Sequence, residues 1–355
     1  MKKYKVVHII NNDKFIKPFI DFIEKNFNST EHLFIFISGG DEKVFFIPKA
    51  NNIININNLY IGKKNILKLS NTLTPYFKQA DKVILHSLFS DDLINYLYLH
   101  QKFLKKSFWV MWGGDLYAHI LTKQTIKNTF FRYRKKRVIK LMGGLVTYIK
   151  GDFELAKKWY GATGQHYECF MYPSNIYKEY SLKEKINKTI NIQVGNSADS
   201  TNNHIKIFEK LKKYKNENIN IYVPLSYGNK EYARKVTIKG KKLFKDKFHP
   251  MTEFMEFDKY LDFLGHIDIA IFAHKRQQAM GNIITLLGLG KKVYMRNDIT
   301  PWNLFKDINV KVYDISNIKL NILSNKEKKL NQVKIQEYFS EENYLKQLKI
   351  LFKSN

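Results

Sequence analysis

The sequence predicts an α/β protein with two consecutive domains, each built around a mainly parallel sheet, and three observations lead to this prediction. Short apolar runs that end in polar or glycine turns alternate with segments of helical periodicity. The alternation occurs as two series, and the highly polar segment "SLKEKINKT" at residues 181–189 lies between them. Because alternating β and α elements are typical of parallel sheets with helices on both faces, we expect two such domains with a cleft between them.

The first series begins at the amino terminus, and we assign it to a first domain at residues 1–175. "YKVVHII" at residues 4–10 is expected to form a strand rather than part of a signal peptide, and "FIKPFIDFIEKNF" at residues 15–27 has helical spacing. The Asn-rich "NNIININN" at residues 51–58 is interpreted as an exposed loop. The other apolar runs are "HLFIFISG" (32–39), "VFFIP" (44–48), "KVILHSL" (82–88), "SFWVMWGG" (107–114) and "GGLVTYI" (143–149).

The second series follows a break in the pattern near Tyr172, so we place a linker at residues 176–190 and a second domain at residues 191–325. A polar, helical tail is expected at residues 326–355, and its last stretch, "NYLKQLKILF", has the apolar spacing to pack on a domain. The segments of the second series are "INIQVG" (190–195), a helix at 203–213, "INIYVP" (219–224), a helix at 229–239, "FDKYLDFLGHI" (257–267), "DIAIFA" (268–273), a helix at 280–289 and "KKVYM" (291–295).

Composition limits the class of protein. The chain has 355 residues, 44% of them hydrophobic, and no apolar run as long as a membrane span. The single cysteine, Cys169, excludes an internal disulfide and is interpreted as a buried apolar residue. The 60 Lys and Arg residues against 32 Asp and Glu give a net charge of +28, which favours an acidic partner such as anionic lipid or nucleotide phosphate. The abundance of Asn, Lys and Ile allows a second explanation, codon bias of an AT-rich coding sequence.

Ligands of open α/β sheets bind beyond the carboxyl ends of the strands, and one such turn follows the apolar run that ends at Val194. Its residues Gly195, Asn196 and Ser197 are small, and a helical pattern comes after them. Small residues let backbone N–H groups approach a ligand, and the amino end of a helix favours an anion such as phosphate. An ordinary capped turn would have a similar sequence, so both interpretations stay open.

Two more turns of the second domain carry candidate ligand-binding residues. A cation beside a helix amino terminus suits a diphosphate, although a solvated basic loop is the alternative. Tyr227 can stack on a nucleobase or be a half-buried surface residue. The candidates after the strand 269–273 are His274, Lys275, Arg276, Gln277, Gln278, Gly281 and Asn282, and those after the strand 219–224 are Ser226, Tyr227 and Gly228.

The sequence predicts no metal site and no cofactor. No His or Cys cluster has the spacing of a zinc site. Asp91 and Asp92 form an acidic pair after a strand, but they precede the helical pattern "LINYLYL". Capping of that helix is therefore the preferred interpretation of the pair.

Four segments together resemble a known family. They are "WVMWGGDLY", "VGNSADSTNNHI", "VPLSYGNKEYARKV" and "FDKYLDFLGHIDIAIFAHKRQQAMGN". In the same order and spacing, they resemble the transferases that move 4-acetamido-4,6-dideoxygalactose (Fuc4NAc) from TDP to lipid II in enterobacterial common antigen synthesis. The likeness runs from the first strand to about Phe305, while the inserted His274 and Lys275 and the high basic charge depart from the family pattern.

The resemblance implies the GT-B architecture, with two Rossmann-like domains, the nucleotide-sugar donor mostly on the second and the acceptor on the first. It also implies hexosyl transfer from a dTDP- or UDP-type donor to a polyprenyl-diphosphate-linked glycan. The protein would then lie peripherally at the cytoplasmic face of the bacterial inner membrane.

Glycosyl transfer requires a neutralised leaving diphosphate and a polarised acceptor hydroxyl. Without a metal cluster, we assign neutralisation to the Gly195 turn, Arg276 and the helix opening near Gly281. The candidate bases are Asp115, which is preferred, Asp13 and His86, all at strand ends of the first domain. The two aspartates can instead be helix N-caps, and His86 a hydrogen-bonded histidine near the core. Candidate acceptor-binding residues are Asn12, Trp112, Gly113 and Gly114.

The segment "KNTFFRYRKKRVIKLM" at residues 127–142 interleaves aromatic and basic side chains, which suits an anionic lipid surface. A helix with a solvated basic face is the alternative. The candidate membrane residues are Phe130, Phe131, Arg132, Arg134, Lys135 and Arg137.

Two other functions are alternatives to sugar transfer. A nucleotide-sugar epimerase on a doubled Rossmann scaffold has the same expected fold, which does not by itself exclude it. A nucleic-acid-binding protein would fit the charge and the 15% aromatic content, but no recognition helix or RNA-binding sheet motif is present. Nucleic acid is therefore not expected as a partner.

Overall fold

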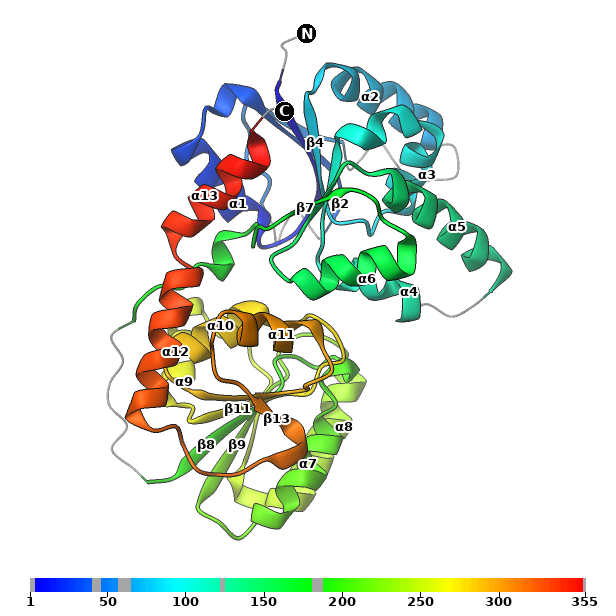
Figure 1. Ribbon diagram of the computed structural model, residues 1–355. Helices are drawn as coiled ribbons and strands as arrows, with labels where there is room; N and C mark the ends of the chain where they lie inside the picture. Colours follow the sequence, from blue (N-terminus) through cyan, green and yellow to red (C-terminus); the bar gives the residue numbers. More distant parts are fainter. Residues whose placement is uncertain (1–3, 40–45, 57–64, 122–124, 181–187, 354–355) are drawn as a thin grey trace. The chain divides into compact units, whose positions relative to one another are not determined.

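The computed structural model describes residues 4–39, 46–56, 65–121, 125–180 and 188–353 (Figure 1). The chain forms two compact units. The amino-terminal unit contains Met1–Ile176 together with Glu341–Asn355, and the carboxyl-terminal unit contains Tyr177–Ser340. The tail expected at residues 326–355 is thus divided, because its first helix belongs to the carboxyl-terminal unit and its last helix to the amino-terminal unit.

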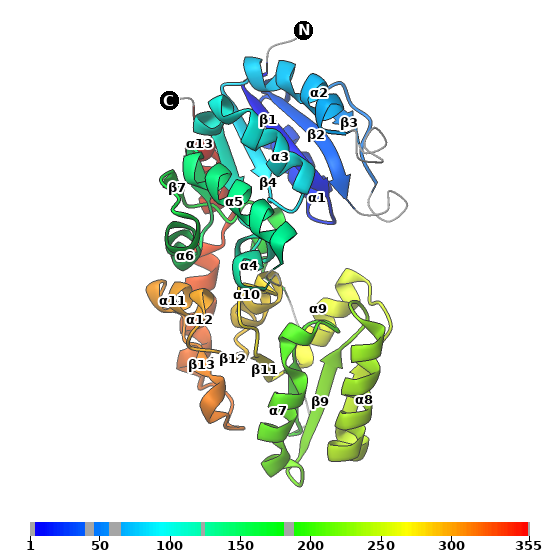
Figure 2. The ribbon, with the colours of Figure 1, turned by 90° about the vertical axis from the view of Figure 1, so that its right-hand side faces the viewer.

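The amino-terminal unit is built on seven parallel strands in the order β3-β2-β1-β4-β5-β6-β7 (Figure 2). Its strands are β1 (Val6–Asn12), β2 (His32–Gly39), β3 (Ile53–Asn55), β4 (Lys82–His86), β5 (Ser107–Val110), β6 (Gly144–Val146) and β7 (Gln165–Tyr167). The central strand β1 is covered on both faces, which explains why its sequence is an almost continuous apolar run.

Helices cover both faces of this sheet. They are α1 (Ile16–Asn26), α2 (Asn65–Gln79), α3 (Asp91–Leu99), α4 (Gly114–Leu121), α5 (Ile126–Leu141), α6 (Lys150–Tyr160) and α13 (Glu341–Phe352). Side chains of α2, α3, α5 and α6 join one apolar cluster with Val7 and Leu85 of the strands. On the other face α1 and α13 lie side by side, with the rings of Phe22 and Tyr344 4.8 Å apart (Figure 1).

The carboxyl-terminal unit contains six parallel strands in the order β10-β9-β8-β11-β12-β13. They are β8 (Ile190–Val194), β9 (Ile219–Pro224), β10 (Phe248–Met251), β11 (Ile269–Phe272), β12 (Lys292–Met295) and β13 (Tyr313–Asp314). The helices are α7 (His204–Leu211), α8 (Lys230–Phe244), α9 (Phe257–His266), α10 (Met280–Gly288), α11 (Thr300–Asp307) and α12 (Asn325–Tyr338). Side chains of α7 and α8 form the core of one face with β8, β9 and β11.

Both sheets have the strand order of a Rossmann fold. In each unit the chain first builds strands on one side of its opening strand and then crosses to the other side. The order therefore reverses between β1 and β4 in one unit and between β8 and β11 in the other. Ligands of doubly wound sheets bind at the carboxyl ends of the strands at this reversal, so the topology selects one edge of each unit as a candidate site.

One predicted element of the amino-terminal unit is wrong. The segment at residues 51–58 was expected to be an exposed loop, but residues 53–55 form β3, which pairs with Phe34–Phe36 of β2. A three-residue edge strand needs only the hydrogen-bonding groups of its neighbour, so an Asn-rich sequence can form it. The strand expected at residues 44–48 lies partly outside the described residues, and residues 46–48 form no strand.

Candidate active site

The Gly195 turn lies at the strand-order reversal of the carboxyl-terminal unit, directly after β8. Gly195 has a φ of +68°, a conformation that side chains other than glycine rarely adopt. A Cβ atom here would lie 2.5 Å from Nε2 of His204 and 2.7 Å from Oδ1 of Asn202. The glycine is therefore required both by its backbone conformation and by the close approach of two polar side chains.

Asn202 holds this turn together, although sequence reasoning did not single it out. Its Nδ2 donates to the carbonyl oxygens of Asp199 (3.0 Å) and Ser197 (3.2 Å), and its Oδ1 accepts from the backbone N–H of Asn196 (3.0 Å). This pattern fixes the amide orientation. Nε2 of His274 lies 2.7 Å from the Asn202 Oδ1 and 3.1 Å from the Asn196 Oδ1, so it must carry the proton and donate it.

His274 is accordingly a buried brace of the turn, with only 1% of its surface exposed. Burial, with smaller contributions from Arg276 and His204, lowers its pKa to about 3 and keeps the ring neutral. Its Nε2 proton is used inside the protein. The structure therefore places His274 beneath the turn, whereas the sequence suggested a donor at the surface of the turn.

Tyr227 presents an exposed ring next to the same turn. Its hydroxyl accepts a hydrogen bond from Nδ2 of Asn196 (2.8 Å), and 52% of its surface is exposed. Gly228 has a φ of +111°, and its backbone forms a bridge with Ala198. Ser226 is also exposed. The turns after β8 and β9 are thus joined, and they present an exposed aromatic ring of the kind that stacks on planar groups.

The loop between β11 and α10 completes this edge. Arg276 and Gln277 are half-buried, and Oε1 of Gln278 accepts from the hydroxyl of Thr201 (2.8 Å). α10 begins after Ala279, which has a φ of +58° and offers no side-chain cap, and Gly281 and Asn282 lie in its first turn. Strained non-glycine backbone is frequent at functional sites, and an amino-terminal helix turn without a side-chain cap retains N–H groups for a ligand.

A second helix start on this edge has the same character. α7 begins after Asn203, whose φ is +52° and whose side chain makes no capping hydrogen bond. Its first residue, His204, is fully buried, and among the described residues its Nε2 has no hydrogen-bond partner. Burial lowers the pKa of His204 to about 4, so the ring is neutral. Burial alone would raise the pKa of Asp199, but hydrogen bonds from Thr201 and the nearby Arg276 lower it overall.

In the amino-terminal unit, Asn12 and Asp13 stand at the carboxyl end of β1. Asn12 is buried and Asp13 is half-buried. Burial raises the pKa of the Asp13 carboxyl above its usual value, and its Oδ1 has no hydrogen-bond partner among the described residues. At the end of the neighbouring β4, Ser87 has a φ of +88° and accepts a hydrogen bond from Nδ2 of Asn11 (2.7 Å). Asp13 therefore lies at the strand-order reversal, beside strained backbone.

Asp115, the preferred base in the sequence interpretation, is fully buried. Its Oδ2 accepts from the N–H of Leu88 (3.0 Å) and from Nε1 of Trp109 (2.7 Å), and its Oδ1 accepts from the N–H groups of Trp112 (2.9 Å) and Leu116 (3.0 Å). Four donors saturate the carboxylate. It holds together the loops after β4 and β5 and does not face open space.

His86 and Trp112 meet at Tyr172, a residue that sequence reasoning did not assign to the site. The Tyr172 hydroxyl lies 2.8 Å from Nδ1 of His86 and accepts from Nε1 of Trp112 (2.9 Å). His86 is fully buried and Trp112 is half-buried, with its ring against Phe15 at 5.8 Å. Gly113, with a φ of +80°, and Gly114, the first residue of α4, follow Trp112. An aromatic surface thus borders Asp13.

The buried histidines predict that stability decreases on acidification. Burial lowers the pKa of His86 to about 3 and that of His32 to about 4. In the unfolded chain these histidines bind protons as the pH falls through about 6.5, whereas in the folded chain they do so only near pH 4 or below. The contribution of the histidines to stability is therefore fully present above about pH 6.5, and it is lost as the pH falls from there to about 4. Urea unfolding followed by tryptophan fluorescence at about pH 7.5, 6 and 5 is expected to show a falling midpoint. A midpoint that does not change with pH would contradict the prediction that His86 and His32 are buried and neutral in the folded chain.

The segment at residues 127–142, which interleaves aromatic and basic side chains, forms most of α5. Phe130 and Tyr133 are exposed over 68% and 62% of their surfaces, and the nearby α4 exposes Ile120 and Leu121. Of the remaining candidates, Arg137 is exposed, Arg132 and Arg134 are half-buried, and Phe131 packs against the core. Among the described helices, none combines the length and apolar character needed to cross a membrane.

Lys135 corrects the expected membrane face. It is buried, and its Nζ donates to the backbone carbonyls of Asp115 (2.8 Å) and Leu88 (3.2 Å). Burial lowers its pKa, although Asp115 acts in the opposite direction. Lys135 therefore fastens α5 to the loop after β4 and does not point at a surface.

Three further observations concern groups away from these edges. Cys169 is buried, and burial raises the pKa of its thiol to about 12, which makes it unreactive. Asp91 and Asp92 lie in the first turn of α3, and Ser90 is the residue that caps this helix. Within the described part of the chain, no group of three His, Cys, Asp or Glu side chains is arranged to hold a metal ion.

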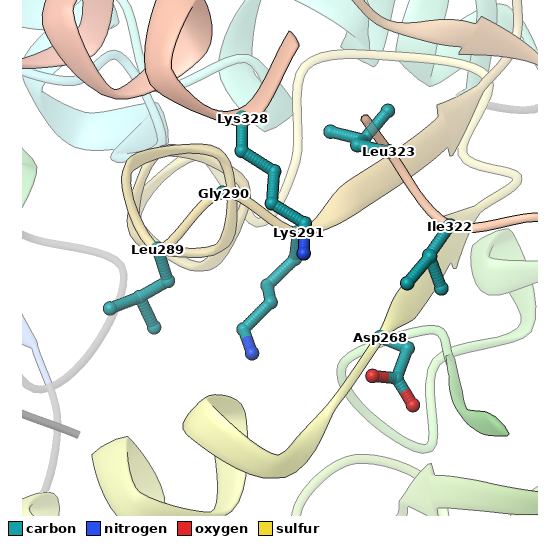
Figure 3. A pocket seen from close by; sticks show the side chains of 7 residues that line it. All are labelled: Asp268, Leu289, Gly290, Lys291, Ile322, Leu323 and Lys328. Carbon is teal, nitrogen blue, oxygen red and sulfur yellow. The ribbon is translucent and has the colours of Figure 1, made fainter. Parts of the chain in front are cut away.

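A small cavity of about 70 Å³ lies in the carboxyl-terminal unit near the amino-terminal ends of β11 and β12 (Figure 3). It is lined by Asp268, Leu289, Gly290, Lys291, Ile322, Leu323 and Lys328. Asp268 accepts from the N–H of Asn191 (2.8 Å), and Lys291 donates to the carbonyl of Gly265. The cavity is at the opposite end of the strands from the Gly195 turn, so it does not belong to the candidate site.

Solved structures identify the fold. A glycosyltransferase from Rickettsia africae ESF-5 has a TM-score of 0.65 at 15% identity, and the match covers 99% of this chain and 98% of the Rickettsia chain. WaaG, a glycosyltransferase involved in lipopolysaccharide biosynthesis, has a TM-score of 0.61 at 12% identity, with coverages of 99% and 100%. An E. coli trehalose-6-phosphate structure bound with UDP-2-fluoro glucose has a TM-score of 0.60 at 10% identity, with both coverages 98%. The fold is GT-B, with two Rossmann-like domains.

The family match is more specific than the fold. The family model described as 4-alpha-L-fucosyltransferase, glycosyl transferase group 56, matches residues 11–354. The chain belongs to this glycosyltransferase family.

Proposed function

We propose that the protein transfers an acetamido-dideoxy sugar from a nucleotide diphosphate to a polyprenyl-diphosphate-linked glycan in bacterial surface polysaccharide synthesis. The observation that carries this proposal is the family match over residues 11–354, and the four segments that resemble Fuc4NAc transferases point to the same reaction. Fucose and Fuc4NAc share a 6-deoxygalactose skeleton, so the family description and the resemblance indicate related sugars. The donor nucleotide is proposed to be of the dTDP or UDP type.

Donor binding is assigned to the carboxyl-terminal unit. The Gly195 turn, Arg276 and the starts of α7 and α10 supply backbone N–H groups, a guanidinium and two positive helix ends at one sheet edge. These groups suit the leaving diphosphate without a metal ion. The exposed ring of Tyr227 is assigned to the nucleobase.

Arg276→Ala is expected to weaken binding of the nucleoside diphosphate by about 1.5–3 kcal/mol, the range for a hydrogen bond to a charged group. Isothermal titration with dTDP, UDP, GDP and CMP measures this loss and identifies the preferred base. Lys275→Ala is the comparison variant in the same loop, because the side chain of Lys275 is exposed whereas that of Arg276 is half-buried. Unchanged affinity in the Arg276 variant, together with loss of binding on adding EDTA, would transfer the neutralising role to a metal ion.

The reaction forms a bond between the anomeric carbon and the acceptor oxygen and breaks the bond between that carbon and the diphosphate, while the acceptor hydroxyl loses its proton. We assign this proton to Asp13. Burial raises the pKa of Asp13, which makes its carboxylate a stronger base, and Asp13 lies at the strand-order reversal. Asp115 and His86 are less suitable bases. Both carboxylate oxygens of Asp115 and both ring nitrogens of His86 already form hydrogen bonds within the amino-terminal unit.

Transfer is tested directly by incubating the protein with dTDP-Fuc4NAc or UDP-sugars and a polyprenyl-diphosphate-linked glycan. The expected product is the extended lipid-linked glycan, with release of the nucleoside diphosphate. A free sugar isomer formed without any acceptor would support the epimerase alternative instead, since the fold alone does not separate the two activities.

We also propose that the protein lies peripherally at the cytoplasmic face of the inner membrane, bound through α5. Exposed aromatic and basic side chains on this helix fit an anionic lipid surface, and each basic residue near such a surface contributes about 1 kcal/mol. Among the α5 side chains that the structure describes, the exposed basic ones are Lys136, Arg137 and Lys140.

Replacing Lys136, Arg137 and Lys140 by Gln is therefore expected to reduce binding to vesicles that contain anionic lipid by about 100-fold. Co-sedimentation at several salt concentrations measures this effect, and salt should weaken binding of the parent protein, since surface charges are screened over about 8–10 Å. The matched control replaces three exposed lysines of α8 by Gln, namely Lys230, Lys241 and Lys242. Equal losses in both variants would mean that net charge, rather than α5, governs binding.

A further inference from the structure

Three buried histidines form a hydrogen-bonded row inside the amino-terminal unit. Nε2 of His8 lies 3.0 Å from Nδ1 of His32, and Nδ1 of His8 lies 3.0 Å from Nε2 of His86. In the sheet register His32 is level with Val6 and His86 with Ile10, so the row crosses β2, β1 and β4 diagonally, from the amino-terminal end of β2 to the carboxyl end of β4. The row then reaches Tyr172 through Nδ1 of His86.

The direction of the hydrogen bonds in this row follows from the two partners of the Tyr172 hydroxyl. An indole N–H can only donate, so the Tyr172 oxygen accepts from Trp112. Among the described residues, Nδ1 of His86 is the acceptor within reach of the Tyr172 hydroxyl proton, so the hydroxyl donates to this nitrogen. His86 then carries its proton on Nε2 and donates to His8, and His8 in turn donates from its Nε2 to His32. One tautomer of each neutral ring satisfies the whole row.

The row is enclosed and uncharged. His8 and His86 are fully buried, and the ring of Phe352 at the end of α13 lies 5.8 Å from the ring of His8 and 4.8 Å from that of His32. Burial lowers the pKa of all three histidines. The charged groups that act on the row are at its ends, Glu31 beside His32 and the two aspartates Asp13 and Asp115 near Tyr172.

A neutral row of this kind is suited to fixing an orientation and not to storing a proton, because a charged imidazole would have to form in a buried site. Its free end at the sheet edge is Trp112, the half-buried ring beside Phe15. Without the Tyr172 oxygen, the indole N–H would lose its partner, and the ring could turn about its side-chain bonds. The hydrogen bond to Tyr172 therefore connects the row to the Trp112 ring.

We propose that His32, His8, His86 and Tyr172 are positioning residues that hold Trp112 in one orientation as a stacking surface for a sugar ring of the acceptor glycan. The inference rests on the proposed function, since it assigns the acceptor to this edge. None of the three histidines contacts the substrate, and each acts through Tyr172.

The hydrogen-bonded state of Trp112 is measured by NMR of indole N–H groups in the intact, ¹⁵N-tryptophan-labelled protein, in which only four tryptophans contribute and Trp112→Phe identifies the signal. Tyr172→Phe and His8→Leu are expected to shift this signal and to speed its exchange with solvent at least about tenfold. His100→Leu is the control, because His100 bonds to Ser70 (2.7 Å) outside the row. An unchanged signal in folded Tyr172→Phe would overturn the proposal, whether or not His8→Leu folds.

Transfer kinetics supply the second readout. Tyr172→Phe and His8→Leu should raise the KM for the acceptor about tenfold and leave the KM for the donor unchanged, whereas His8→Gln should restore the acceptor KM, since an amide offers one acceptor and one donor like the neutral ring. If the acceptor KM of His8→Gln equals that of a folded His8→Leu, the proposed direction of the hydrogen bonds in the row is wrong. If the parent protein transfers no sugar, the proposed function fails, and the NMR signal still decides whether the row orients Trp112.

Discussion

Replacing Asp13 by Asn is expected to lower kcat by about 10²–10⁴-fold, the usual loss when a general base is removed. The amide keeps the size of the carboxyl group but cannot accept the acceptor proton. Nucleotide affinity should stay the same, because the donor groups belong to the carboxyl-terminal unit. Turnover at saturating donor, with nucleotide binding measured in parallel, separates these effects. In the parent protein, activity should fall as the pH drops through the raised pKa of Asp13.

Asp115→Asn provides the contrasting control. Both Asp115 oxygens accept hydrogen bonds from N–H donors, so an amide would direct its own N–H₂ at two of those donors. The expected result is a loss of stability of about 1–3 kcal/mol, visible as a lower midpoint of urea unfolding. A stable Asp115 variant without turnover, beside an active Asp13 variant, would reverse the two assignments.

The fold class followed from the alternation of strand and helix patterns, because a chain that must bury both faces of a sheet shows this in its sequence. The run that became β8 and the helix after the Gly195 turn are examples. The edge strands were harder to predict. β3, β10 and β13 contain two to four residues each, and they depend on pairing with a neighbour more than on their own apolar pattern.

The site was only partly predictable for a related reason. Strand ends and small residues identify turns, so Gly195, Tyr227 and Asp13 could be selected as candidates, and the structure places them at the carboxyl edges of the sheets. Whether a polar side chain points out of such a turn or into it depends on distant partners. His274 meets Asn202, which is 72 positions away, and His86 meets Tyr172, 86 positions away.

The packing of the last helix also depends on partners that are distant in the sequence. The apolar spacing of residues 343–352 indicated packing on a domain but not on which one. In the structure, Nζ of Lys82 at the start of β4 donates to the carbonyls of Leu351 and Lys353, and Gln347 accepts from the N–H of Phe170 (3.2 Å). These contacts fasten α13 to the amino-terminal unit, where it closes the face that contains the histidine row.

Leu348→Ala is therefore expected to destabilise the amino-terminal unit by about 2–5 kcal/mol, the cost of truncating a fully buried leucine. Ile350→Ala, on the same helix but 56% exposed, should change stability by less than about 0.5 kcal/mol. Urea unfolding followed by the fluorescence of Trp109, Trp112 and Trp159 measures this unit, and Trp302→Phe removes the signal of the other unit. Similar losses in both variants would contradict the assigned buried face of α13. A large loss in Leu348→Ala alone would show that a segment that begins about 150 residues beyond the linker helps to form the proposed acceptor-binding unit.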